Sequence, residues 1–189
     1  MEDFKLYFNT GWDHIVSTDA TDHILFILAL GAVYTLRKWK PVLILVTAFT
    51  LGHSFTLALS VSDLVWFSSK WVEFLIPVTI VLTSLFNLFR PAEGNYKVNY
   101  VLALFFGLIH GMGFANTIRF MLAKDQQILV PLLGFNIGVE AGQVLVVATL
   151  LALQWLIVQR AGLNHKLWIR LISGITLLWG LWLASGRLP

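Results

Sequence analysis

The stretch that decides the fold is PVLILVTAFTLGHSFTLALSV, residues 41–61, which contains no Asp, Glu, Lys or Arg. An α-helix rises about 1.5 Å per residue and the hydrocarbon core of a bilayer is about 30 Å thick, so about 20 apolar residues suffice to cross it. The stretch therefore predicts a transmembrane helix, and His53 lies near its middle.

Five more apolar runs surround this one. We expect an all-α fold, a bundle of six transmembrane helices in a single domain of residues 1–189. The expected spans are approximately 18–37, 41–61, 72–89, 98–120, 130–158 and 167–184. Helices of this length with short connections use up the chain, so no separate soluble domain is expected.

The composition excludes several functional classes. Hydrophobic residues make up 58% of the chain and charged residues 12%, whereas about 25% of the residues in soluble domains are charged. The net charge is only +3, and the sequence contains no basic cluster long enough to follow a phosphate backbone. This argues against a nucleic-acid partner. The absence of cysteine excludes thiolate metal ligands and cysteine nucleophiles. The lipid bilayer is the expected environment.

The connections between the spans predict the orientation, because cytoplasmic loops are enriched in Lys and Arg. The first, third and fifth connections contain eight such residues: Arg37, Lys38, Lys40, Arg90, Lys97, Arg160, Lys166 and Arg170. The other side contains five. Both termini are therefore expected on the non-cytoplasmic side of a multi-pass protein of the cell (inner) membrane.

The first span is short, because Ile24–Leu36 supplies only 13 apolar residues. To cross the bilayer, its helix must extend back to about Thr18 and carry His23 and Asp22 into the membrane. Alternatively, the bilayer thins locally and these two residues stay at the headgroups.

Ionisable residues inside membrane spans cost about 2.5–3.5 kcal/mol each on insertion scales, so they are candidates for function. Four positions qualify, and they supply five side chains: Asp22–His23 at the start of the first span, His53, His110 and Glu140. At 1.5 Å per residue, His53 and His110 lie about 18 Å from the cytoplasmic ends of their spans. Glu140 lies about 15 Å below Val130, the outer end of its span, and therefore about 15 Å from the inner face of the bilayer. All five fall near the midplane and its outer side, which favours one shared site. Taken singly, each histidine could instead hydrogen-bond a neighbouring helix.

Polar neighbours could orient these side chains as an outer shell. The candidates are Asp19 near Asp22, Thr50 and Ser54 near His53, and Asn136 and Gln143 near Glu140. Small residues allow helices to approach closely. Gly107 and Gly111 are therefore expected to bring His110 close to Glu140, whose helix carries Gly138 and Gly142. The same glycine-rich faces could instead join copies of the chain in a homo-oligomer.

Imidazole and carboxylate groups without thiolates suit nickel, cobalt, zinc or iron(II). We therefore expect a divalent transition metal ion at the cluster, with nickel, cobalt or zinc as its identity. His14 lies outside the apolar run and is either a further ligand or an interfacial residue.

Four motifs resemble the HupE/UreJ family of nickel and cobalt permeases. They are His14–Ile15 followed by Asp22–His23–Ile24, FTLGHS at residues 49–54, GLIHGMGF at 107–114, and GVEAGQ at 138–143. The resemblance covers essentially the whole chain. It implies transition-metal transport associated with hydrogenase or urease maturation.

The leading hypothesis is a metal-transport protein in which His23, His53 and His110 supply nitrogen ligands. Asp22 and Glu140 would balance the charge, and His14 would capture the ion or gate the site. One alternative is a zinc-dependent intramembrane hydrolase that uses the same cluster, in which a carboxylate acts as general base. Another is an assembly subunit whose polar cluster only holds helices together.

Overall fold

The computed structural model describes residues 2–17, 21–89, 96–121 and 128–189. Within these ranges the chain is helical and has no strands. Its seven α-helices are α1 (Glu2–Val16), α2 (Thr21–Gly31), α3 (Trp39–Val61), α4 (Ser69–Phe89), α5 (Tyr96–Met121), α6 (Leu129–Gln154) and α7 (His165–Gly186). A 3-10 turn, η2 (Leu36–Lys38), leads into α3, and a π-helical stretch, η3 (Trp155–Arg160), extends α6.

Five helical segments in the described ranges are long and apolar enough to cross a membrane. They are Leu36–Val61, Ser69–Phe89, Lys97–Met121, Leu129–Arg160 and His165–Gly186. Large apolar side chains cover their outer faces; on α7, for example, Leu178 is 70% exposed and Trp182 68% exposed. An apolar outer surface on helices of this length is what a lipid environment requires. The chain is therefore a multi-pass membrane protein.

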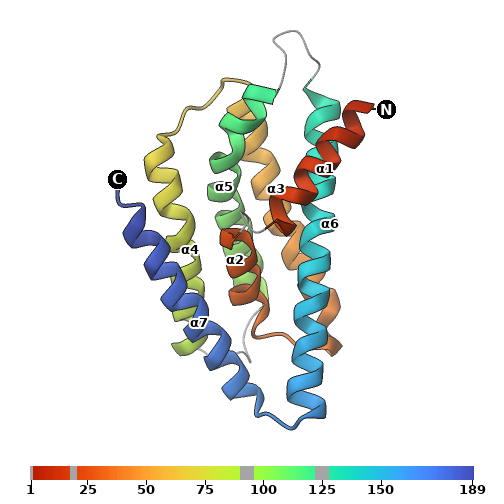
Figure 1. Ribbon diagram of the computed structural model, residues 1–189, viewed down its shortest axis with the longest axis vertical. Coiled ribbons are helices and arrows are strands. Elements are labelled where there is room, and N and C mark those ends of the chain that lie inside the picture. Colours follow the sequence, from red (N-terminus) through yellow and green to blue (C-terminus); the bar gives the residue numbers. More distant parts are fainter. Residues whose placement is uncertain (1, 18–20, 90–95, 122–127) are drawn as a thin grey trace.

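The segment predicted to form the first span does not form one long helix. Its helix, α2, contains only 11 residues and ends at Gly31. Sequence analysis did not expect the preceding helix α1, which has polar and charged residues along much of its length. In Figure 1, α1 descends from the N-terminal end to the middle of the bundle, and α2 continues from there toward the opposite end. Two short helices thus occupy the place of one long one.

Glycines allow the close packing of two helix pairs. A Cβ atom added to Gly11 of α1 or to Gly138 of α6 would collide with the backbone of the other helix. On α5, the same is true of Gly107 and Gly111, which face the backbone of α3 near His53. The glycine faces are therefore occupied within one chain. They pair α1 with α6 and α3 with α5.

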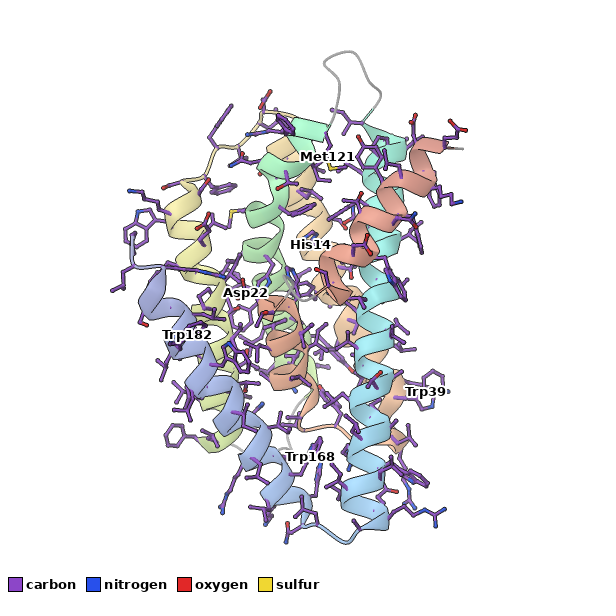
Figure 2. The ribbon with its side chains drawn as sticks, in the orientation of Figure 1. His14, Asp22, Trp39, Met121, Trp168 and Trp182 are labelled. Atoms are coloured by element: carbon purple, nitrogen blue, oxygen red, sulfur yellow. The ribbon has the colours of Figure 1, made fainter. Side chains whose placement is uncertain are left out.

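The two ends of the bundle differ in charge. One end, called here the basic end, carries Arg37, Lys38, Lys40, Arg160 and Lys166 on η2, η3 and the first turns of α3 and α7. Both termini lie in the half of the molecule away from it, called here the far end (Figure 1). His14 and Asp22 lie near the middle of the bundle, whereas Trp39 and Trp168 lie toward the basic end (Figure 2).

Candidate metal centre

Four histidines from four helices converge at the middle of the bundle. His14 lies in the last turn of α1, His23 in the first turn of α2, and His53 and His110 near the middles of α3 and α5. The ring centroids of His14 and His23 are 4.5 Å apart, and those of His23 and His110 are 4.9 Å apart. The His53 ring lies 6.1 Å from His14 and 6.3 Å from His23. The break between α1 and α2 thus places two histidines beside two others.

Three nitrogens of this cluster lie close enough together that one metal ion could bind to all of them. His14, His23 and His53 each offer one ring nitrogen, and these three atoms lie within 4.8 Å of one another. Among the described residues, no hydrogen-bond partner exists for Nε2 of His14, Nε2 of His23 or either nitrogen of His53. Buried polar atoms normally have partners. Unpartnered imidazole nitrogens this close together therefore fit a divalent transition metal ion.

His110 borders the same space but is held by an additional residue. Its Nε2 lies 3.0 Å from the hydroxyl of Thr79 on α4, and its Nδ1 has no partner in the described part of the chain. An outer-shell partner of this kind fixes the tautomer and the ring orientation of a ligand histidine. Sequence reasoning missed Thr79. The available signal was a row of polar residues, Thr79, Thr83 and Asn87, within an apolar helix.

Aromatic side chains enclose the cluster. The Phe114 ring lies 4.0 Å from His14 and stacks on Phe135 at 4.9 Å. Phe49 packs at 5.1 Å from His110 and 6.2 Å from His53. An apolar surround strengthens the electrostatic interaction of an ion with its ligands because it lowers the local dielectric.

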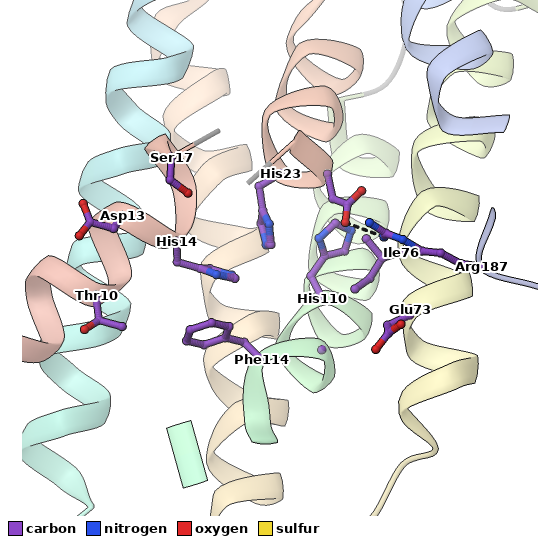
Figure 3. A pocket seen from close by; sticks show the side chains of 12 residues that line it. Thr10, Asp13, His14, Ser17, His23, Glu73, Ile76, His110, Phe114 and Arg187 are labelled. Atoms are coloured by element: carbon purple, nitrogen blue, oxygen red, sulfur yellow. Dashed lines mark hydrogen bonds and ion pairs between the residues drawn. The ribbon is translucent and has the colours of Figure 1, made fainter. Parts of the chain in front are cut away.

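A cavity of about 600 Å³ borders the histidines, and it extends toward the far end as far as Glu73, near the start of α4. Figure 3 shows the rings of His14, His23 and His110 among the side chains that line it. Asp13, Asp22 and Glu73 also line it, and Asp13 and Glu73 are exposed. Carboxylates around the mouth of a cavity raise the local cation concentration.

Asp22 lies beside the cluster, but its charge is partly neutralised. Its Oδ2 accepts a hydrogen bond of 2.7 Å from Nη1 of Arg187, at the end of α7. Its Oδ1 is buried without a partner among the residues described. Sequence reasoning had no means of finding Arg187, because 165 positions separate it from Asp22.

Glu140 does not join the histidine group. Its Oε1 accepts a hydrogen bond of 2.7 Å from Thr47 of α3. Thr47 precedes His53 by six residues, about 9 Å along the helix, so this carboxylate lies nearer the basic end than the His53 ring. The glycines of α5 and α6 contact α3 and α1 instead of each other. The expected close approach of His110 to Glu140 through these glycines is therefore not found.

The expected outer-shell residues have different partners. Gln143 accepts a hydrogen bond of 2.9 Å from Thr50, which joins α6 to α3. Ser54 donates to the Thr50 carbonyl within its own helix. Asn136 donates a hydrogen bond of 2.8 Å to the Leu132 carbonyl within its own helix, and its Oδ1 has no hydrogen-bond partner in the described ranges. Asp19 lies outside the described residues.

A family model described as HupE / UreJ protein matches residues 1–185. The chain belongs to the HupE/UreJ family. Comparison with curated proteins gave no match, and comparison with solved structures gave none either. The match spans all four converging histidines, so the cluster lies within the part of this HupE/UreJ protein that the family model covers.

Proposed function

We propose that this protein binds a divalent transition metal ion at the histidine cluster and transports it across the cell (inner) membrane. The observation that carries the proposal is the set of His14, His23 and His53 nitrogens within 4.8 Å of one another. Membership in the HupE/UreJ family and the five long apolar helices support a transport role.

The roles of the residues follow from their positions. His23, His53 and His110 are the buried ligands, and His14, which lines the cavity, receives the ion from it. Asp22 balances the charge of the ion when Arg187 releases its carboxylate. Glu140 supplies a second negative charge farther toward the basic end. Nickel, cobalt and zinc are the ions proposed, since each binds imidazole and carboxylate groups.

The proposed orientation places the basic end in the cytoplasm, in accordance with the enrichment of Lys and Arg in cytoplasmic loops. The paired helices α1 and α2 then form one broken crossing, which gives six crossings in total. Broken helices at the midplane are a recurring way to build a substrate site in transporters. The 600 Å³ cavity would open to the outside, and the ion would move inward.

The test is metal uptake by liposomes that contain the purified protein, with nickel, cobalt and zinc offered separately. A double variant, His53→Ala with His110→Ala, is the comparison, and folding is checked by gel filtration and circular dichroism. Metal bound near stoichiometry and accumulated by the wild type, but not by the folded variant, is expected. Metal-dependent hydrolysis of a lipid or peptide without uptake would instead identify an intramembrane hydrolase. No binding of any of the three ions would reject both functions.

A further inference from the structure

A second cavity, of about 330 Å³, lies between α2, α4 and α5. Three polar side chains line it: Thr83 and Asn87 of α4 and Asn99 of α5. The other lining residues are apolar: Leu30, Leu82, Phe86, Leu102, Phe105 and Phe106. Thr83 and Asn87 are buried, at 6% and 5% exposure. The cavity belongs to no part of the metal site described above.

The two cavities lie one after the other along the bundle. On α4, Ile76 lines the first cavity, Thr79 contacts His110, and Thr83 lines the second. On α5, His110 lines the first cavity, and Phe106, four residues or about 6 Å away, lines the second. The second cavity therefore lies on the basic-end side of the histidines.

Phe26 of α2 separates the cavities. It is 1% exposed, and its ring centroid lies 5.1 Å from His110, 5.1 Å from Phe49 and 5.9 Å from Phe106. A hydrated ion cannot pass through packed aromatic rings at these distances. The histidines are therefore open to the far end and closed toward the basic end.

A row of polar side chains passes beside this aromatic barrier. Thr79, Thr83 and Asn87 recur every four residues on one face of α4, and all three are buried. Thr83 donates a hydrogen bond to the Thr79 carbonyl, and Asn87 donates to Ala29 of α2. Hydroxyl and amide oxygens are harder ligands than the imidazole nitrogen. They therefore bind a borderline transition metal ion less tightly. Such a row suits release of an ion.

Among the described residues, the alternative row, between α3 and α6, borders a much smaller cavity. Thr50 and Gln143 join these helices on the basic-end side of His53. The cavity that Gln143 lines measures only about 10 Å³, which is at most the room of a single water molecule.

We infer that the ion leaves the histidine cluster past Phe26 and along Thr79, Thr83 and Asn87 into the second cavity. In this inference Phe26 is the inner gate, and the structure is the conformation that is open to the far end. The inference rests on the transport function proposed above and adds its inner half.

The test uses single-cysteine variants, because the chain contains no cysteine of its own. Thr83→Cys and Asn87→Cys report whether a thiol reagent reaches the second cavity, and Ser17→Cys reports whether it reaches the first. Ser173→Cys on α7 is the matched control, since Ser173 is 0% exposed and lines neither cavity. Each variant is reconstituted in vesicles of known sidedness and treated with a membrane-impermeant thiol reagent from one side at a time.

Two exposed positions calibrate the sides: Arg37→Cys for the basic end and Ser68→Cys for the far end. We expect Thr83→Cys and Asn87→Cys to react from the same side as Arg37→Cys, and Ser17→Cys from the side of Ser68→Cys. Ser173→Cys should not react from either side. Modification of Thr83→Cys should abolish most of the metal uptake. In a Phe26→Ala background, Thr83→Cys should also become reactive from the far side.

Three results would overturn the inference. The first is reaction of Thr83→Cys and Asn87→Cys with membrane-permeant reagents alone, which would make the second cavity a lipid-chain pocket. The second is unchanged uptake after complete modification of Thr83→Cys. The third is unchanged sidedness in a folded Phe26→Ala variant and in the milder Phe26→Leu variant. The labelling needs no metal. Labelling as expected in a protein that takes up no ion would therefore reject the transport function while leaving a water-filled path.

Discussion

His14 and His23 approach to 4.5 Å between ring centroids from the two sides of a break in the backbone helix. One lies in the last turn of α1 and the other in the first turn of α2. A continuous helix would separate residues nine positions apart by about 13 Å along its axis. The break therefore brings these two imidazoles together, and it does so where His53 and His110 meet them.

This relationship predicts that His14 is a metal ligand. The His14→Ala variant should bind cobalt more weakly than the wild type, because it loses one of three nitrogens within 4.8 Å of one another. The ligand-field absorption of bound Co²⁺, which depends on the number and geometry of its ligands, should change in shape as well as in midpoint.

The matched control is His165→Ala. His165 is the first residue of α7, at the basic end and outside the cluster. Its removal should leave the cobalt spectrum unchanged. An unchanged spectrum for His14→Ala would assign His14 to packing against Phe114, with which it is in ring contact.

The second prediction concerns the ion pair between Arg187 and Asp22. The Arg187→Gln variant removes a positive charge from the cavity and frees the Asp22 carboxylate, so cations should bind more tightly and arrive faster. The gain should decrease as ionic strength rises, because salt screens charges in a solvent-filled cavity. Titration calorimetry at low and high salt measures the gain in affinity and its decrease with ionic strength. Weaker binding in Arg187→Gln would mean that the pair holds α7 and α2 in place and does not compete with the ion.

The third prediction concerns Thr79, which contacts the Nε2 atom of His110. The Thr79→Val variant keeps the shape of the side chain and removes the hydroxyl. Loss of an outer-shell partner typically lowers metal affinity about 10- to 100-fold. Thr149→Val is the control, because Thr149 is an exposed threonine of α6 whose hydroxyl donates to the Leu145 carbonyl of the same helix. Equal metal affinities of the two variants would show that the Thr79 hydroxyl does not support metal binding.

Much of the site could be predicted from the sequence, because charge and imidazole in an apolar helix are costly. His23, His53 and His110 stand out for this reason, and their expected convergence agrees with their ring contacts. The contribution of α1 could not be predicted in the same way. This helix is too polar to register as a span, and it is held on α6 by backbone contact at Gly11 and Gly138.

The glycines illustrate why the sequence does not predict which helices pack against each other. Their spacing on α5 and α6 correctly indicates close helix contact, since small residues allow it. The spacing carries no information on which helix makes the contact. In the structure, α3 takes the face of Gly107 and Gly111, and α1 takes that of Gly138. Glu140 is therefore left with Thr47 instead of His110.

The fourth prediction follows from that packing. In a Gly107→Ala variant the new methyl group would overlap the Phe49 carbonyl and touch the His53 backbone nitrogen at 3.1 Å. Because backbone cannot rotate away as a side chain can, α3 and α5 must separate. Overpacking of this kind typically costs about 1–3 kcal/mol. The variant should melt at a lower temperature and also bind metal more weakly, since His53 and His110 lie on the two helices that move apart.

Gly174→Ala on α7 is the matched control for this variant. Apart from its chain neighbours and the backbone of its own helix, no atom of the described residues lies within 4 Å of the position its Cβ would take. Alanine is favoured over glycine inside a helix by about 0.5–1 kcal/mol. Its melting temperature should stay the same or rise, with metal affinity unchanged. A Gly107→Ala variant that melts lower but binds metal as the wild type does would show that the site tolerates movement of α5.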